Sequence, residues 1–279
     1  MFNWLLEPLQ YAFFLRGLTT GLIVAAACGV LSGFIVWRGM AFVGDALAHA
    51  VLPGIVISYF LGWNILIGAL IAAVISVLAI GTLSTHKGFK EDTSIGVIFT
   101  GAFALGILLI SRIATSKDLT HILFGSILGV TRFDLIITAV IGALVIALVL
   151  LFYKELLVTS FDKAHAVAIG LSPVLIHHGL LLTIAFTTVI STQTVGVVLV
   201  LALLVTPAAT ASLLAKKLSV ITGLSVVFSL TSVLAGLYIS YYFDLEAGAA
   251  VVIILTLFFT LAFAYSKIRS ITRLKEKAV

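Results

Sequence analysis

The chain has 279 residues, of which 62% are hydrophobic and only 10% are charged, with a formal net charge of +5. Soluble domains carry roughly 25% charged residues, so this composition excludes a soluble fold and indicates a polytopic membrane protein. The single cysteine, Cys28, excludes an internal disulfide and a cysteine-based metal cluster. The positive charge does not indicate a nucleic-acid partner, because basic residues of membrane proteins gather in cytoplasmic loops.

A membrane-spanning helix needs roughly 20 mainly apolar residues, and the chain offers about eight or nine such segments. The expected spans, in chain order, are 15–37, 40–61, 63–84, 93–113, 134–153, 173–192, 194–214, 219–242 and 247–266. No loop between them is long enough to form a soluble domain. We therefore expect an all-α polytopic membrane protein in which residues 1–279 form a single transmembrane domain.

The basic residues predict the orientation of these spans. If the first span leads from outside to inside, twelve basic residues fall on the inside and four on the outside. The inside set is Arg38, Lys87, Lys90, Lys154, Lys163, Lys216, Lys217, Lys267, Arg269, Arg273, Lys275 and Lys277, and the outside set is Arg16, Arg112, Lys117 and Arg132. This bias predicts a cytoplasmic C-terminus. The side of the N-terminus stays open, because residues 1–14 could lie flat at the membrane surface.

Small residues recur every four positions in the first two spans. The first row is Gly21, Ala25, Gly29 and Gly33, and the second row is Ala46, Ala50, Gly54 and Ser58. Such rows allow helix backbones to approach closely in lipid, so we interpret both as packing surfaces rather than sites.

The stretch "GDALAHAVLPG" (44–54) places Asp45 and His49 one turn apart, about 6 Å along a helix axis. An ionisable group inside a span costs at least about 2.5 kcal/mol, which favours a functional role. Pro53 has no N–H to donate to the carbonyl of His49, so we expect that carbonyl to be free. A carboxylate, an imidazole and a carbonyl suit a first-row divalent cation such as manganese, iron or zinc. In a two-fold dimer the set would double. The alternative is an Asp–His contact that only braces helices, with Pro53 as a kink.

A second proline stands inside a span, in "TQTVGVVLVLALLVTPAATASLLA" (192–215). Pro207, after Thr206, predicts an interrupted helix, and proline-interrupted spans often border a transport pathway. The alternative is a bend filled by small residues.

The longest inside loop before the C-terminal tail is 154–172, "KELLVTSFDKAHAVAIGLS". Ser160 or Asp162 is suited to cap a short helix that runs to Ala168, with Gly170 ending it.

Three stretches resemble a known family. "MAFVGDALAHAVLPGIVIS" (40–58), "LFGSIL" (123–128) and "TVGVVLVLALLVTPAATA" (194–211) are similar to signature stretches of the permease subunits of manganese, zinc and iron ABC importers. This is the ABC-3 permease group, which works with cluster A-I binding proteins, and the likeness covers nearly the whole chain. It implies a type II ABC importer-like fold, similar to permeases for vitamin B12 and iron-siderophores, in a bacterial plasma (inner) membrane.

The resemblance also implies partners and site roles. The partners are a second copy of the chain, two cytoplasmic ATPase subunits and an extracytoplasmic metal-binding protein, with no permanently bound cofactor because the metal is cargo. Asp45 and His49 would meet the metal. The "HAVLPG" form is more similar to manganese and iron permeases than to zinc permeases, so manganese is the preferred ion and zinc and iron are the alternatives.

In that family the loop equivalent to 154–172 carries a coupling helix that docks on the ATPase. The resemblance assigns that role to Ser160, Asp162, Ala164, Ala168 and Gly170. An ordinary interfacial helix is the alternative.

The sequence also bears on two other function classes, an enzyme and a secondary transporter. The chain has neither the G-x-x-x-x-G-K-[ST] loop of an ATPase nor the H-E-x-x-H motif of a metalloprotease, so we expect a transport subunit and not an enzyme. A proton-coupled secondary transporter, with Asp45 and His49 as a proton relay, stays as the alternative.

Overall fold

The computed structural model describes residues 6–86, 88–112 and 127–277, with side chains to residue 269. Within these ranges all regular elements are helical, and nine of them are long and apolar enough to cross a membrane. These nine are α2 (Ala12–Trp37), α3 with α4 (Val43–Ala50 and Leu52–Leu61), α5 (Ile65–Thr85), α6 (Glu91–Ile110), α8 (Arg132–Leu151), α11 (Pro173–Val195), α12 (Val197–Leu214), α13 (Leu218–Phe243) and α14 (Ala247–Lys277). The all-α fold and the predicted spans are confirmed.

The shorter elements lie between the spans. They are η1 (Pro8–Gln10), η2 (Ile127–Gly129), α9 (Tyr153–Phe161) and α10 (Lys163–Ala168). The motif "LFGSIL" falls mostly outside the described residues, with only its last two positions in η2. The segment 1–14, which could lie flat at the membrane surface, falls partly outside the described residues, and its described part contains η1 and the first residues of α2.

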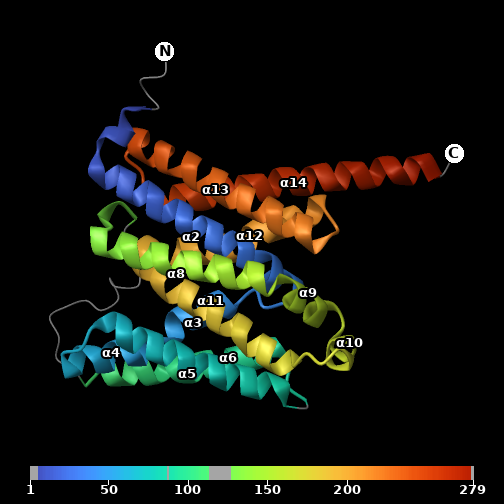
Figure 1. Cartoon of the computed structure of the whole chain (residues 1–279). Coiled ribbons are helices and arrows are strands. Elements are labelled where there is room, and N and C mark those ends of the chain that lie inside the picture. Colours follow the sequence, from blue (N-terminus) through green and yellow to red (C-terminus); the bar gives the residue numbers. More distant parts are fainter. Residues whose placement is uncertain (1–5, 87, 113–126, 278–279) are drawn as a thin grey trace.

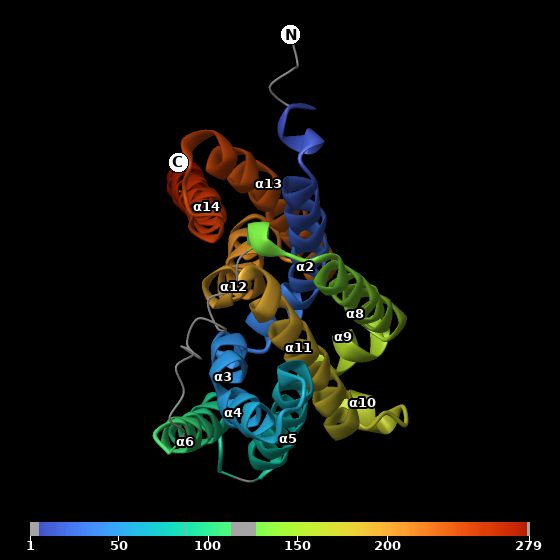
Figure 2. The ribbon, with the colours of Figure 1, turned by 90° about the vertical axis from the view of Figure 1, so that its left-hand side faces the viewer.

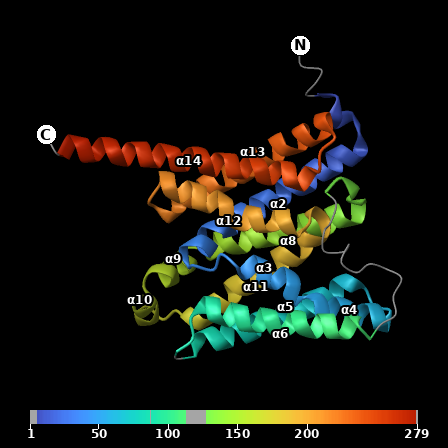
Figure 3. The ribbon, with the colours of Figure 1, turned by 180° about the vertical axis from the view of Figure 1, so that it is seen from behind.

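Successive spans alternate in direction, so the N-terminal end and the C-terminal end lie at opposite ends of the bundle (Figure 1). The view from behind shows α9, α10 and the end of α14 at the same end (Figure 3). Arg38, Lys163 and Lys216, from the predicted inside set, belong to this end. We call it the basic end.

Two groups of helices are joined by a middle pair. The first group is α2, α12, α13 and α14, and the second is α4, α5 and α6. Figure 2 shows α3 and α11 between these groups. α3 packs against both α12 and α6, so the segment that carries Asp45 and His49 lies where the two groups meet.

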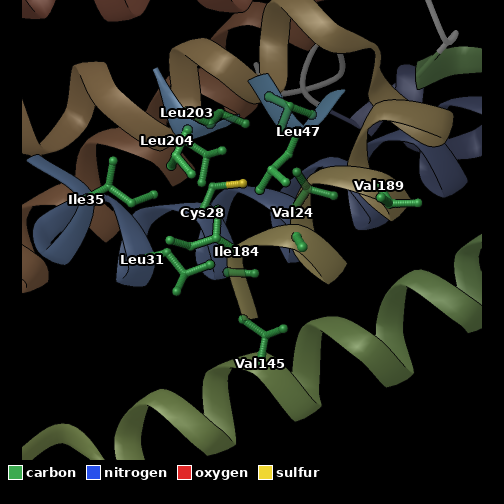
Figure 4. Close-up of a cluster of buried hydrophobic side chains, with 14 of the residues drawn as sticks. Val24, Cys28, Leu31, Ile35, Leu47, Val145, Ile184, Val189, Leu203 and Leu204 are labelled. Carbon is green, nitrogen blue, oxygen red and sulfur yellow. The ribbon is translucent and has the colours of Figure 1, made fainter. Parts of the chain in front are cut away.

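The core surrounds α2 (Figure 4). Val24, Cys28, Leu31 and Ile35 of α2 are buried there with residues from four other spans, namely Leu47, Val145, Ile184, Val189, Leu203 and Leu204.

The two rows of small residues are contact surfaces between helices, as predicted. In the first row, a Cβ at Gly29 would lie 2.9 Å from the Cα of Val226, so α2 and α13 touch backbone to backbone. In the second row, a Cβ at Gly54 would overlap the carbonyl oxygen of Gly68 in α5. Real Cβ atoms do not approach other atoms so closely, so both contacts require glycine.

Candidate functional site

The orientation of α3 is set by its buried side. Leu47 is fully buried in the core, beside Leu203 and Leu204 of α12 (Figure 4). Each residue turns an α-helix by about 100°, so Asp45 and His49, two positions before and after Leu47, lie on the opposite face. Their side chains are 40% and 29% exposed, respectively. The chain therefore leaves this polar face of α3 partly open.

The carboxylate and the imidazole meet on that face. His49 Nε2 lies 3.5 Å from Asp45 Oδ1, which is longer than a well-formed hydrogen bond. Asp45 stands in the first turn of α3, where the helix dipole stabilises a negative charge. The two groups are thus close enough to share one cation and are not locked to each other.

Two phenylalanines of α6 hold the ring of His49. The ring centroids lie 5.9 Å from Phe99 and 5.3 Å from Phe103, the second in an edge-to-face arrangement. His49 Nδ1 is buried and has no hydrogen-bond partner among the described residues. Aromatic packing, rather than a hydrogen bond from Nδ1, orients this imidazole.

The helix break lies just after the pair. α3 ends at Ala50 and α4 starts at Leu52, so Pro53 falls in the first turn of α4, where its missing N–H costs no helical hydrogen bond. The N–H of Val51 donates to the carbonyl of His49. The expectation that this carbonyl is free was therefore wrong, because the chain breaks before the proline and Val51 supplies a donor.

Pro207 and Thr206 lie in the middle of a helix, whereas Pro53 lies at the start of one. α12 runs without interruption from Val197 to Leu214 with Pro207 inside it, so the predicted break is absent. The N–H of Ala208 donates to Ser32 Oγ of α2 at 3.1 Å, both groups being buried. The hydroxyl of Thr210 donates to the carbonyl of Thr206. A contact between α2 and α12 thus accommodates the proline within a continuous helix.

The predicted short helix of the loop 154–172 is present as α10. Asp162 caps it, its Oδ1 accepting from the N–H of His165 at 2.9 Å. Gly170 follows the helix with φ +83°, a left-handed conformation that glycine adopts without strain. Ala164 and Ala168 are exposed, so α10 projects from the basic end of the bundle.

Ser160 is not the cap of this helix. It lies inside α9, where its Oγ accepts a hydrogen bond from Arg38 Nε at 2.9 Å. The sequence left Ser160 and Asp162 as alternative N-caps of α10. Asp162 is the cap, because α9 continues past Ser160 to Phe161 and the backbone becomes extended at Asp162.

Asp45 and His49 are the metal-binding side chains that the described part of α3 brings together. Among the described residues there is no group of three or more His, Cys, Asp or Glu side chains that could hold a metal ion. The Asp45–His49 pair therefore offers two ligands from the chain itself.

The model of the ABC 3 transport family matches residues 10–266. The chain belongs to this family. It is a membrane permease of an ABC transporter, a multi-pass bacterial membrane protein, and not the ATPase subunit.

Two relatives of the ABC-3 chain cover it almost completely. It is 44% identical over 269 residues to a probable iron transport system membrane protein of Haemophilus influenzae, covering 96% of this chain and 99% of the relative. It is 46% identical over 261 residues to the manganese transport system membrane protein MntC of Halalkalibacterium halodurans, covering 93% and 89%.

Two solved structures are also similar. PsaBC from Streptococcus pneumoniae in complex with Fab has a chain that is 38% identical, with a TM-score of 0.81 and coverage of 94% of this chain and 95% of that one. An inward-facing metal-chelate type ABC transporter is 19% identical, with a TM-score of 0.65 and coverage of 91% and 85%, and shows the shared fold alone.

Sequence reasoning did not find Phe99 and Phe103. Their spacing of four residues places them on one face of α6, but nothing in the sequence indicates that this face meets His49. Arg38 served only as a positive-inside marker, and its partners in α9 and α11 are more than a hundred residues away.

Proposed function

We propose that this ABC-3 chain forms the membrane pathway of an ATP-driven importer of divalent transition-metal ions. Asp45 and His49 bind the ion during its passage. The observation that carries the proposal is the contact between these two partly exposed side chains, in which His49 Nε2 lies 3.5 Å from Asp45 Oδ1. It places two metal-binding groups together on an otherwise apolar span. A carboxylate oxygen and an imidazole nitrogen are the ligands that first-row divalent metals share.

Manganese is the preferred ion, with iron or zinc as alternatives. Relatives that match more than 90% of the chain carry manganese or iron in their names. The metal is cargo, so the pair needs to hold it only transiently.

A second copy of the chain completes the site. Octahedral coordination, which manganese favours, requires six ligand atoms, and the described part of one chain offers only the Asp45–His49 pair at this face. The open face of α3 is available to a symmetry-related copy, whose own pair doubles the set to two carboxylates and two imidazoles. Water molecules supply the remaining ligands.

Two ATPase subunits bind at the basic end, which faces the cytoplasm together with the C-terminus. α10 is the contact, since Val167 in it and Ile169 just after it expose 62% and 53% of their surface. These apolar side chains project from the end of the bundle, where a partner groove can bury them. An extracytoplasmic metal-binding protein delivers the ion to the opposite end.

The competing function is proton-coupled transport, in which Asp45 and His49 relay protons. Reconstitution of the chain with its ATPase in vesicles distinguishes the two. We expect manganese uptake to require ATP and to continue after an ionophore collapses the proton gradient. Uptake that does not depend on ATP and stops when the ionophore is added would contradict the proposal of an ABC importer.

A further inference from the structure

A half-buried cluster of polar side chains lies at the basic end, apart from Asp45 and His49. It lines a cavity of about 490 Å³ bordered by the ends of α2, α5 and α9 and by the starts of α6, α10 and α11. Arg38, Ser84, Glu91, Thr159, Ser160 and His177 contribute its polar groups. Neither the metal site nor the contact with the ATPase accounts for this cluster.

Arg38 is the centre of the cluster. Its Nε donates to Ser160 Oγ at 2.9 Å and its Nη2 donates to Thr159 Oγ1 at 3.0 Å. Both hydroxyls donate their own hydrogens to carbonyls within α9, so their oxygens are free to accept from Arg38. The planar guanidinium thus donates two hydrogen bonds to the last turn of α9.

The contact of the third nitrogen of Arg38 determines the tautomer of His177. Nη1 lies 3.4 Å from His177 Nδ1, and because arginine can only donate, Nδ1 accepts and the hydrogen sits on Nε2. Nε2 then donates to Ser84 Oγ at 3.3 Å, and Glu91 Oε1 lies 3.3 Å from it. A neutral imidazole therefore bridges Arg38 to the ends of α5 and α6.

The cluster contains groups of opposite charge, Arg38 and Glu91. Burial lowers the pKa of the Arg38 guanidinium, and the nearby Glu91 carboxylate opposes that change. The two opposite charges line the same cavity, so their attraction favours the arrangement in which the end of α2 lies near the start of α6.

A tight turn connects Arg38 to the metal-binding helix. The N–H of Gly39 donates to the carbonyl of Val36, and the N–H of Met40 donates to that of Ile35. With Gly39 at φ +73°, this pair of bonds is a Schellman motif. Met40 is fully buried and its carbonyl accepts from the N–H of Val43, the first residue of α3. The chain between Arg38 and α3 has little freedom to absorb a displacement.

We propose that Arg38 is a positioning residue that transmits movement of the α9–α10 segment to Asp45 and His49. Thr159 and Ser160 lie within the last three residues of α9, directly before the cap of α10. A shift of α10 pulls on Arg38, and the rigid turn at Gly39 and Met40 carries the shift to α3. This inference rests on the proposed function, in which the ATPase binds α10.

The test uses the complete transporter in vesicles and measures manganese ions imported per ATP hydrolysed. We expect Arg38→Gln to lower this ratio by about two- to thirtyfold, the range for residues that carry coupling between sites, while ATP hydrolysis continues. Arg38→Lys keeps the positive charge but lacks the planar guanidinium with its several donors, so it should lower the ratio by an intermediate amount. The matched control is Arg16→Gln, at the other end of α2, where the side chain of Arg16 donates to the carbonyl of Ala12 in its own helix.

A purely structural role would lower yield, ATP hydrolysis and uptake together and leave their ratio unchanged, which would overturn the inference. If Arg38→Gln does not assemble, the double variant Thr159→Val with Ser160→Ala removes the two acceptors from α9 and decides by the same ratio. If the unmodified transporter imports no manganese with ATP, the proposed function fails. If it does and both variants keep the ratio, only the role of Arg38 fails.

Discussion

Asp45 and His49 lie one turn apart on α3, with Nε2 3.5 Å from Oδ1, on the face opposite the fully buried Leu47. The same short helix is thus anchored in the core on one side and leaves a carboxylate and an imidazole accessible on the other. A site that must bind and then release an ion requires this combination of fixed position and open access.

The aromatic contact on His49 predicts a first effect. Phe103→Ala removes the edge-to-face partner of the imidazole. Because such pairs contribute about 0.5–1.5 kcal/mol, we expect the KM for metal uptake to rise by roughly two- to twelvefold. Phe263→Ala is the control, since Phe263 stacks on Phe259 in α14 and is 53% exposed. Equal KM values for the two variants would contradict a role of Phe103 in orienting His49.

The contact between α4 and α5 predicts a loss of stability. A Cβ at Gly54 would overlap the carbonyl oxygen of Gly68, whereas a Cβ at Gly101 would meet no atom within 4 Å. Gly54→Ala should destabilise the protein by about 1–3 kcal/mol. Gly101→Ala should leave it unchanged or stabilise it by up to about 1 kcal/mol. Thermal unfolding in detergent measures both, and a stable Gly54→Ala protein would show that the helices are not in close contact.

The hydrogen bond between Ala208 and Ser32 predicts coupling between α2 and α12. Ser32→Ala leaves the buried N–H of Ala208 without its acceptor, at a cost of about 1–3 kcal/mol. In a Pro207→Ala background α12 can restore its regular hydrogen bonds, so Ser32→Ala should then cost less. A double-mutant cycle in thermal stability checks this. Strictly additive effects would reject the account.

The cap of α10 predicts an effect on assembly. Asp162→Ala removes the acceptor for the N–H of His165, which costs about 0.5–2 kcal/mol of helix stability. We expect less ATPase to co-purify with this variant, whereas Asp162→Asn, which keeps a capping oxygen, should retain it. Full association in Asp162→Ala would show that α10 does not form the contact.

The sequence predicted the spans well because about 20 apolar residues in a row have few alternatives to crossing a membrane. It predicted the rows of Gly29 and Gly54 as packing surfaces but not their partners, α13 and α5. The helices that carry these rows, α2 and α4, are apolar on nearly all sides, so no stripe of polar residues indicates which face meets which neighbour.

The prolines show the same limit. Pro53 indicated an irregular helix correctly, but the break itself lies at Val51, because proline is favoured in the first turn of the helix that follows. At Pro207 the helix continues, because Ser32, 176 positions away in the chain, accepts the displaced N–H. Such a contact depends on tertiary packing, which a local pattern does not contain.

We propose that Asp45 and His49 bind the imported metal. The most direct test is manganese uptake by the reconstituted transporter carrying Asp45→Asn or His49→Ala, with Asp92→Asn, an exposed acid in the first turn of α6, as the matched control. We predict that uptake falls by at least about tenfold in both site variants, as expected on losing a metal ligand, while assembly and the control stay unchanged. Normal uptake by both site variants would contradict the account.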